Sequence, residues 1–514
     1  MSEQAVATGT PAGGVEPIDL RRLSLDSFRG RPVAVLGFAR SGIALARFLA
    51  DRGAQVTVYD GRPRAELAEA AAALEGRPAR LLLGPEVDPA DALRGQALVA
   101  TSPSVSSRFP TTEPRLRAAL AALEAEARVP VVGEVDLFLR LCPATTVGVT
   151  GTKGKTTTSA LCAAVLGAGE ASVLLGGNIG RPLVERLPQL APGQRVVLEL
   201  SELQLPTLSR GTDVAVYTHV SQDHLDRHGT VEAYRAVKRR LAELLAADGV
   251  LVLNDEDPVS REYAAATRAR VVRYARRPPG EGEVGVDAGS IVARGVLPLA
   301  GGARLTGELM PLVDIPLPGA HNVSNVLAAV AVGVLFGVTG PAMREAVAAF
   351  AGVEHRLESV ATIDGVRFVN DSQGTQPDAV VAALRSFDRP LVLIAGGRDK
   401  GVPLDELAAV AALRADAVVL IGESADRLEA ALRVAGQASI ERAATLEAAV
   451  RRGDAIARGL LAAGAPPPAT VLLSPAAASF DMFVDYAARG RAFKAAVAEL
   501  AAGRGGAPDD EGRA

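Results

Sequence analysis

The sequence predicts an α/β protein with three domains in series, and three observations support this prediction. The chain has 514 residues, enough for roughly three domains of ~150 residues each. Short apolar runs alternate with alanine-rich helical segments along most of its length, a pattern typical of mostly parallel sheets flanked by helices. Two apolar runs lead directly into glycine-rich turns, where such folds bind phosphate groups. We therefore expect Rossmann-like first and last domains around a central P-loop-type domain.

Composition and charge restrict the class of protein. Lysine and arginine number 55 against 59 aspartates and glutamates, a net charge of −4, which gives no indication of a nucleic-acid partner. Cys142 and Cys162 are the only cysteines, too few for a disulfide scaffold, and we expect both to be packing residues. Residues 1–17 lack a secretory signal, and the longest apolar stretch, Val323–Val338, is shorter than the ~20 residues that span a bilayer. It is predicted as a buried helix, in a cytoplasmic protein without membrane insertion.

Changes in composition indicate where the domains meet. Pro143 precedes the central glycine-rich turn, and both ends of the chain are polar or rich in glycine. The expected segments are a disordered tail at 1–28, a first domain at 29–143, a central domain at 144–350, a last domain at 351–502 and a second disordered tail at 503–514.

The first domain opens with a βαβ unit. The strand Pro32–Gly37 is followed by a helix that ends near Arg52 and by the strand Gln55–Tyr59. Its turn reads G-x-A-x-x-G and Asp60 ends the second strand, the outline of a dinucleotide-binding fingerprint with alanine in place of one glycine. A turn closed by small residues, with no ligand, is the alternative. Ser102 follows a later strand at the same sheet edge, where a nucleotide of any kind would fit.

The central domain opens with the stretch Thr146-Val-Gly-Val-Thr-Gly-Thr-Lys-Gly-Lys-Thr-Thr-Thr158. An apolar strand ends at Val149, the chain turns through two glycines, and a helical pattern runs over Ser159–Leu166. Converging backbone N–H groups and a helix N-terminus form a phosphate cradle, in which Lys155 would reach the β- and γ-phosphates and the Thr156 hydroxyl would contact Mg²⁺. Valine replaces the first glycine of the usual GxxxxGK[ST] pattern. An ordinary loop is the alternative.

Histidines gather downstream of this stretch. All five lie between positions 219 and 355, and three belong to His219-Val-Ser-Gln-Asp-His-Leu-Asp-Arg-His228, directly after a strand ending at Thr218. A loop dense in histidine and aspartate at the end of a parallel strand can supply magnesium ligands and substrate contacts. His224 is the best single candidate, and a solvated polar loop is the alternative.

Glu199 is a carboxylate inside the otherwise apolar run Arg195–Leu200, where burying it without a partner would be costly. Either a metal ion or an arginine opposite it would remove that cost. Asn178 lies in a glycine-rich loop that by itself indicates only a turn. Lys238, on the predicted helix Val231–Ala246, is by itself a surface lysine.

The other predicted elements follow from the same alternation of apolar strands and alanine-rich helices. They are the helix Arg115–Glu126, the strands Val129–Val132, Ala97–Thr101, Val214–Thr218 and Gly249–Leu253, irregular loops and edge strands over Arg276–Gly302, and the last-domain strands Arg367–Val369, Leu391–Ala395, Ala417–Ile421 and Thr470–Leu473.

Taken together, these stretches resemble the Mur ligases, the ATP-dependent amide-bond-forming enzymes of peptidoglycan assembly. Thr150-Gly-Thr-Lys-Gly-Lys-Thr-Thr157 is similar to the family's TGTNGKTT loop, with Lys153 in place of asparagine. Other similar motifs follow in the family's order over the central and last domains. These are Gly177-Asn-Ile-Gly180, Leu198-Glu-Leu-Ser-Glu-Leu-Gln204, Asp223-His-Leu-Asp-Arg-His228, Gly319-Ala-His-Asn-Val-Ser-Asn325, His355-Arg-Leu-Glu358, Asn370-Asp-Ser372 and Leu473-Ser-Pro-Ala-Ala-Ala-Ser-Phe-Asp481.

The resemblance is closest to the members that add D-glutamate to UDP-N-acetylmuramoyl-L-alanine. It implies that the first domain binds the UDP-sugar, the second binds ATP and the third brings glutamate, with domain closure assembling the site. The implied reaction passes the γ-phosphate of ATP to the L-alanine carboxylate, and the amine of glutamate then attacks the acyl phosphate. The implied cofactors are ATP, two Mg²⁺ ions and a carbamylated Lys238. We expect a monomer.

The resemblance also implies roles for individual residues. Lys155, Glu199, His224 and Lys238 are the implied catalytic residues, and Thr156, Glu199, His224 and carbamylated Lys238 the implied metal ligands. The implied ATP-binding residues are Gly151, Thr152, Lys153, Gly154, Lys155, Thr156, Thr157, Thr158, Asn322, Asn325, Arg356 and Asp371. Those for the UDP-sugar are Arg40, Ser41, Asp60, Ser102, Asn178 and His224, and those for the amino acid are Gln373, Thr375, Lys400, Ser479 and Phe480.

Two departures from the family's pattern bear on the amino acid. Gln373 replaces a lysine expected close to the acyl phosphate, and an amide cannot supply its charge, although Lys400 and Arg398 could compensate. The stretch Ser201-Glu-Leu203 stands where these enzymes commonly have Ser-Ser-Phe. The alternatives are therefore a Mur ligase or a folylpolyglutamate synthetase-like enzyme that adds another amino acid, a nicotinamide-dependent oxidoreductase built on the first βαβ unit, and a non-catalytic nucleotide-binding regulator.

Overall fold

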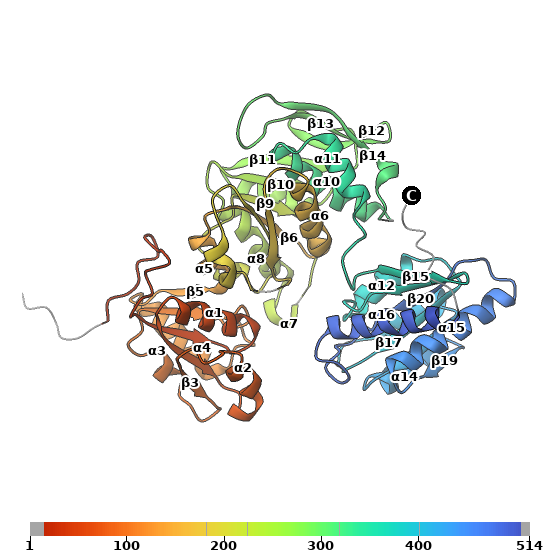
Figure 1. The fold of residues 1–514 in the computed structure, drawn as a ribbon, viewed down its shortest axis with the longest axis horizontal. Coiled ribbons are helices and arrows are strands. Elements are labelled where there is room, and N and C mark those ends of the chain that lie inside the picture. The colour runs from red at the N-terminus through yellow and green to blue at the C-terminus, as the bar shows by residue number, and fades with distance from the viewer. Residues whose placement is uncertain (1–14, 181, 224, 318, 400, 505–514) are drawn as a thin grey trace, which may run out of the picture. The chain divides into compact units, whose positions relative to one another are not determined.

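A computed structural model describes residues 15–180, 182–223, 225–317, 319–399 and 401–504. The described residues form three sheets (Figure 1), and the chain divides into two compact units that meet in sequence at Phe350 and Ala351. The first unit carries two sheets and the second carries one. No helix in the described part of the chain is both long and apolar enough to cross a membrane.

The first sheet is wholly parallel, with the strand order β3-β2-β1-β4-β5. Its strands are fully buried at the centre, since every residue of β4 and four of five in β1 are shielded from solvent. The strands are β1 (Pro32–Leu36), β2 (Gln55–Asp60), β3 (Ala79–Leu83), β4 (Leu98–Thr101) and β5 (Val131–Gly133). The helices are α1 (Arg40–Asp51), η1 (Arg64–Leu67), α2 (Ala68–Ala72), α3 (Pro89–Leu93), α4 (Pro114–Glu126) and α5 (Glu134–Leu141).

The second sheet has the order β14-β13-β12-β11-β10-β9-β6-β8-β7, parallel from β7 to β12 and antiparallel beyond. Its strands are β6 (Thr145–Thr150), β7 (Val173–Gly177), β8 (Arg195–Glu199), β9 (Val214–Tyr217), β10 (Val250–Asn254), β11 (Arg270–Ala275), β12 (Glu283–Asp287), β13 (Ser290–Val296) and β14 (Leu305–Pro311). Its helices are α6 (Lys155–Gly167), η2 (Val184–Gln189), η3 (Leu205–Thr207), α7 (Leu225–His228), α8 (Val231–Glu243), α9 (Pro258–Glu262), η4 (Tyr263–Ala266), η5 (Leu312–Asp314), α10 (Ala320–Leu335) and α11 (Gly340–Ala348).

The third sheet has the order β15-β16-β20-β17-β18-β19 and is parallel except for β15. Its strands are β15 (Glu358–Ile363), β16 (Val366–Asn370), β17 (Leu391–Gly396), β18 (Ala417–Ile421), β19 (Ile440–Arg442) and β20 (Ala469–Leu473). Its helices are α12 (Pro377–Arg385), α13 (Asp405–Arg414), α14 (Ala425–Val434), α15 (Leu446–Ala462) and α16 (Tyr486–Gly503). Separate apolar clusters line the two faces of this sheet.

One apolar cluster joins the first two sheets. It includes Phe138 of α5, together with Leu183 and Val184 at the start of η2, which are all nearly inaccessible to solvent. The first sheet therefore does not form an isolated core, because burying apolar side chains against η2 stabilises both parts of the first unit.

The prediction of a disordered tail over residues 1–28 is wrong for the part that the structure describes. Phe28 is fully buried and Ile18 is 5% exposed, both within the core of the first unit. The backbone N–H of Ile18 also donates to the carbonyl of Ala97 at 2.9 Å. These scattered apolar residues gave no periodic signal, but tertiary packing orders them. Residues 1–14 and 505–514 lie outside the described residues.

Candidate active site

The phosphate loop lies between β6 and α6, at the carboxyl end of a strand in the middle of the central sheet. Gly151 and Gly154 adopt positive φ angles of 153° and 87°. A Cβ on Gly151 would lie 2.1 Å from Oγ1 of Thr218, and a Cβ on Gly154 would lie 2.7 Å from Oδ1 of Asn325. Both positions therefore require glycine, because side chains there would be strained and would displace neighbours that hold the loop.

Neighbouring elements hold the loop in place. The Thr152 N–H donates to the carbonyl of His219 at 2.6 Å, and its Oγ1 accepts from the Ser221 N–H at 2.9 Å. The Thr218 hydroxyl donates to the carbonyl of Lys153 at 2.6 Å. The Lys155 ammonium donates to the carbonyl of Thr152 at 2.9 Å, so its charge lies over the loop at the N-terminus of α6.

Helix α10 contacts the same helix N-terminus through Asn325, which is 7% exposed. Its Oδ1 accepts from the Thr158 hydroxyl and its Nδ2 donates to Oδ1 of Asn322, both at 3.1 Å. The structure thus brings two predicted ATP-binding asparagines next to the phosphate loop, although more than 150 residues separate them from it in sequence.

Glu199 ends β8, and β6 lies alongside it in parallel register. Its side chain is buried, and Oε1 accepts from Nδ2 of Asn178 at 3.0 Å. Its other oxygen, Oε2, is buried without a hydrogen-bond partner among the described residues. A buried carboxylate oxygen with no donor is costly, and a cation would remove the cost. This oxygen is therefore suited to binding a metal ion. Thr156, in the first turn of the adjacent helix α6, would supply its hydroxyl to the same ion.

Lys238 is fully buried on α8, so its interpretation as a surface lysine is wrong. Its Nζ lies 3.4 Å from Oγ1 of Thr150 and 5.5 Å from the centre of the Tyr234 ring. Burial, and next the nearby charge of Lys155, lower the pKa of the Lys238 amine to about 7. Periodicity could not find this burial, because the helix carries charged residues on several faces.

The glycine-rich turn of the first sheet is organised by Asp60, which is 8% exposed. Its carboxylate accepts from the Phe38 N–H at 2.8 Å and forms a two-point pair with the Arg62 guanidinium. Although burial opposes the shift, the hydrogen bonds from Arg62 and Phe38 hold its pKa below the ordinary value. Ser102 Oγ donates to the Gly37 carbonyl at 3.1 Å. Both residues therefore shape the turn after β1.

The two other predicted UDP-sugar residues of this turn begin α1. Arg40 is exposed and Ser41 is half-buried, and both stand at the N-terminal end of a helix, where anions bind favourably.

In the second unit, Asp371 follows β16 and is 5% exposed. It accepts from the Ser474 hydroxyl at 2.6 Å and from the Leu357 N–H at 3.2 Å. Burial raises the pKa of this carboxyl to about 6, against the lowering effects of Ser474 and Arg356. Asp371 and Arg356 therefore lie at one edge of the third sheet, and Arg356 is exposed.

The predicted amino-acid residues lie on two loops that Arg489 joins. Its guanidinium, 1% exposed, donates to Oγ and the carbonyl of Ser372 at 3.1 and 3.0 Å and to the carbonyl of Ala477 at 3.2 Å. Burial lowers its pKa to about 10. Sequence reasoning missed Arg489, because nothing in the sequence separates it from the nearby exposed Arg491. The first loop carries Gln373 and Thr375. The second carries Ser479, which is buried, and Phe480, whose side chain is 64% exposed.

Two predicted site residues, His224 and Lys400, lie outside the described residues. Among the residues with described positions, no group of three or more His, Cys, Asp or Glu side chains is gathered as a metal cage. Beyond Glu199 and the Thr156 hydroxyl, a metal ion there would take further oxygen ligands from a bound nucleotide or from water, as Mg²⁺ commonly does.

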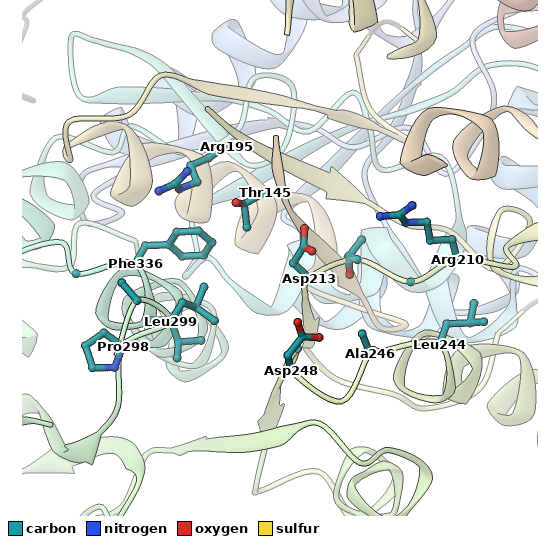
Figure 2. A pocket seen from close by; sticks show the side chains of 16 residues that line it. Thr145, Arg195, Arg210, Asp213, Leu244, Ala246, Asp248, Pro298, Leu299 and Phe336 are labelled. Carbon is teal, nitrogen blue, oxygen red and sulfur yellow. The ribbon is translucent and has the colours of Figure 1, made fainter. Parts of the chain in front are cut away.

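A cavity of about 450 Å³ lies at the opposite, amino-terminal edge of the central sheet (Figure 2). There the Arg195 guanidinium lies 5.1 Å from the centre of the Phe336 ring, and Oδ2 of Asp213 accepts from the N–H and hydroxyl of Thr146. None of the predicted site residues lines this cavity. The chemistry-bearing side chains instead gather at the carboxyl edge, where parallel sheets bind ligands.

Comparison with known proteins identifies the family. The profile described as "Mur ligase middle domain" matches residues 149–333, and "Mur ligase, glutamate ligase domain" matches residues 355–477. A UDP-N-acetylmuramoylalanine–D-glutamate ligase of Symbiobacterium thermophilum is 40% identical over 469 residues, which cover 91% of this chain and 98% of the relative. The chain belongs to the Mur ligase family. The resemblance inferred from the motifs is thereby confirmed.

Other Mur ligases agree with this assignment. A ligase of the same name from Koribacter versatilis is 38% identical over 92% of this chain and 98% of its own length. Among solved structures, the UDP-N-acetylmuramate–alanine ligase MurC from Thermotoga maritima has a TM-score of 0.53 at 18% identity, covering 91% of this chain and all of that one. MurF from Acinetobacter baumannii has a TM-score of 0.52 at 16% identity, covering 87% and 90%. The predicted α/β class with three domains in series is confirmed.

Mur ligase membership establishes an enzyme class as well as a fold. The family consists of ATP-dependent ligases that form amide bonds and use Mg²⁺. The expectation of an ATP-dependent acid–amino-acid ligase is therefore confirmed, and the oxidoreductase and the non-catalytic regulator are no longer the alternatives to weigh.

Proposed function

We propose that this Mur ligase adds D-glutamate to UDP-N-acetylmuramoyl-L-alanine, a step of peptidoglycan precursor synthesis on which cell-wall formation, cell shape and division depend. The observation that supports this proposal most is the near full-length identity of 35–40% to several relatives that carry the name of that activity. The phosphate loop, the buried Glu199 and the buried Lys238 supply groups that such a reaction needs.

The reaction must bring two anions close together, the L-alanine carboxylate and the γ-phosphate of ATP, before a bond can form between them. The L-alanine carboxylate attacks the γ-phosphorus of ATP, which releases ADP and leaves an acyl phosphate. The neutral amine of D-glutamate then attacks the acyl carbon, and inorganic phosphate leaves as the amide forms. Lys155 and the N–H groups at the start of α6 counter the phosphate charge through these steps.

The residues around β8 fit a magnesium ion. Glu199 Oε2 and the Thr156 hydroxyl would hold the nucleotide-bound ion, and His224 with carbamylated Lys238 would hold a second. Bound Mg²⁺ supplies positive charge that lets the carboxylate approach the triphosphate. Asn178 holds Glu199 Oε1 at 3.0 Å, so the carboxylate is already oriented by the loop that is proposed to contact the UDP-sugar.

Lys238 is suited to carbamylation. The reaction adds carbon dioxide to a neutral amine and releases a proton, so it needs an amine that is not held as an ammonium ion. Burial of Lys238 disfavours the ammonium form. The carbamate would replace the buried amine by an anionic oxygen donor beside the phosphate loop.

Substrate binding is assigned to three groups of residues. For ATP these are Gly151, Thr152, Lys153, Gly154, Lys155, Thr156, Thr157, Thr158, Asn322, Asn325, Arg356 and Asp371. For the UDP-sugar they are Arg40, Ser41, Asp60, Ser102, Asn178 and His224, and for glutamate they are Gln373, Thr375, Lys400, Ser479 and Phe480. Asp60 acts by holding the Phe38 N–H in the turn, because both of its oxygens already accept hydrogen bonds.

The amino acid is the part of the proposal that most needs a test, because Gln373 supplies no positive charge. Phosphate release is measured with UDP-N-acetylmuramoyl-L-alanine, ATP and one of D-glutamate, L-glutamate, L-lysine or diaminopimelate. Of the four amino acids, we expect only D-glutamate to give phosphate release, and we expect no release when the UDP-sugar is omitted. Release with L-lysine, L-glutamate or diaminopimelate in place of D-glutamate would favour a related ligase. A monomeric state and a cytoplasmic location stay predictions.

A further inference from the structure

Glu134 is a buried carboxylate that has no role in the proposed mechanism. It is the first residue of α5, directly after β5 ends the first sheet, and it is 3% exposed. The backbone N–H groups of Leu183 and Val184 lie near its carboxylate and favour its charged form. Its Oε1 is buried and has no hydrogen-bond partner in the described ranges. A buried carboxylate oxygen without a donor is costly, so its presence calls for an explanation.

The surroundings of Glu134 are almost wholly apolar. Helix α5 packs against α1 and η2, and the apolar residues of all three belong to one cluster. The nearby charge that acts on Glu134 is that of Arg40, at the start of α1. A second link across the same junction is the ion pair of Arg47 Nε with Glu185 Oε1 at 3.0 Å, in which both side chains are about one-third exposed. The Glu134 carboxylate lies near the backbone of Leu183 and Val184, where η2 begins.

The groups on either side of Glu134 connect to both substrates. Arg40 follows the glycine-rich turn of the first sheet, where the UDP-sugar is proposed to bind. Leu183 lies five residues after Asn178, whose side chain and backbone N–H hold Oε1 and the carbonyl of Glu199 at 3.0 and 2.8 Å. Glu134 therefore stands between the turn for the UDP-sugar and the segment that reaches the metal-binding carboxylate.

We propose that Glu134 is a positioning residue for the ligase reaction, which fixes Leu183 and Val184 against the start of α1 and so sets the UDP-sugar relative to the phosphate loop. The inference rests on the proposed function, because it takes from it the residues that bind each substrate. A charged carboxylate suits this task better than an amide, since it can accept from two N–H groups and attract Arg40 at once.

The test compares Glu134→Gln with the matched variant Glu185→Gln, which removes a carboxylate at the exposed edge of the same junction. Phosphate release is measured at saturating D-glutamate while the UDP-sugar or ATP is varied. For Glu134→Gln we expect the KM for the UDP-sugar to rise about tenfold and kcat to fall, with the KM for ATP within about twofold of the wild type. Glu185→Gln should keep all three constants. Glu134→Asp, which retains the charge, should restore part of the loss.

Two outcomes would overturn the inference. One is a folded Glu134→Gln enzyme with the wild-type KM for the UDP-sugar. The other is an equal loss for ATP and the UDP-sugar, or an equal loss in Glu185→Gln, since both indicate a general loosening of the junction. Thermal melting checks the fold, and if Glu134→Gln does not fold, Glu134→Asp decides by the same KM comparison. If the wild type releases no phosphate with the UDP-sugar, the proposed function fails with it, whereas an active wild type isolates the failure to Glu134.

Discussion

Lys155 is the residue whose single charge bears most directly on the reaction. Its ammonium lies over the phosphate loop, 2.9 Å from the Thr152 carbonyl, and can turn from that neutral acceptor to a phosphate oxygen. We predict that Lys155→Ala lowers kcat at least about a thousandfold, because a positive charge is lost in the transition state. Phosphate release measures the loss, and a melting curve checks the fold. Turnover near that of the wild type would remove the phosphate-cradle argument.

Lys238 carries a second prediction at this scale. If its side chain works as a carbamate, Lys238→Ala removes an anionic oxygen donor and leaves a small cavity beside Thr150. We predict that the variant loses activity and that added formate or acetate restores part of it, because a short carboxylate can enter the space. Glu134→Gln, whose defect lies elsewhere, should gain nothing from these anions. Absence of rescue in a folded variant would argue against a carbamate.

Glu134 gives a prediction about stability and pH. Burial raises the pKa of this carboxyl from 4.5 to about 7. Between these values the folded state binds more protons than the unfolded state, so the free energy of unfolding falls as pH rises from 4.5 to 7. At pH 8 the full penalty is present, at most about 3 kcal/mol. Glu134→Gln should therefore gain stability over the wild type at pH 8 and lose that advantage near pH 4.5. Urea unfolding measures the difference, and an advantage independent of pH would contradict it.

Single residues differ in how far the sequence reveals them. Glu199 could be predicted as a metal-binding candidate, because a carboxylate within an apolar strand stands out in the sequence itself. Its Oε2, buried without a hydrogen-bond partner among the described residues, is consistent with that prediction. Lys238 could not be predicted as buried from periodicity, and only the family resemblance singled it out. Arg489 and Glu134 had no signal at all, since what matters about them is the backbone they face across the fold.

At the scale of elements, the strand–loop–helix unit at β6 was the best predicted part of the chain. The helix begins at Lys155, four residues before the predicted Ser159, because the threonines after Lys155 have low helix propensity that packing overrides. Strands β3, β7, β11, β14, β15 and β19 were missed. Their glycines or charged residues interrupt the apolar pattern, and pairing with a neighbouring strand stabilises them instead.

Helix α16 yields a prediction of its own, because its first turn ties the two amino-acid loops together through Arg489. A lysine cannot reach Ser372 and Ala477 with the same planar set of donors. We predict that Arg489→Lys raises the KM for D-glutamate about tenfold or more, with a smaller effect on the KM for ATP. The matched control is Arg491→Lys on the exposed face of the same turn, which should behave as the wild type. Equal effects of the two substitutions would contradict the argument.

At the scale of the molecule, the residues that we propose to bind ATP are divided between two compact units. The phosphate loop and Asn325 belong to the first, and Arg356 and Asp371 belong to the second. We predict that a non-hydrolysable ATP analogue together with the UDP-sugar lowers the radius of gyration measured by small-angle X-ray scattering, because on this proposal one nucleotide would bind residues of both units. The Lys155→Ala variant should compact less. An unchanged radius at saturating ligand would contradict domain closure.

The hydrogen bond between Asn178 and Glu199 has a consequence for how the two large substrates influence each other. A cation that binds with the nucleotide would immobilise the Glu199 carboxylate. The immobilised carboxylate would in turn hold the Asn178 amide, which is proposed to contact the UDP-sugar. The substrate that binds first then orders these two side chains, so the second substrate binds at a smaller cost in conformational entropy. Such cooperativity is reciprocal by thermodynamic necessity, so the sugar must tighten nucleotide binding by the same factor as the nucleotide tightens sugar binding.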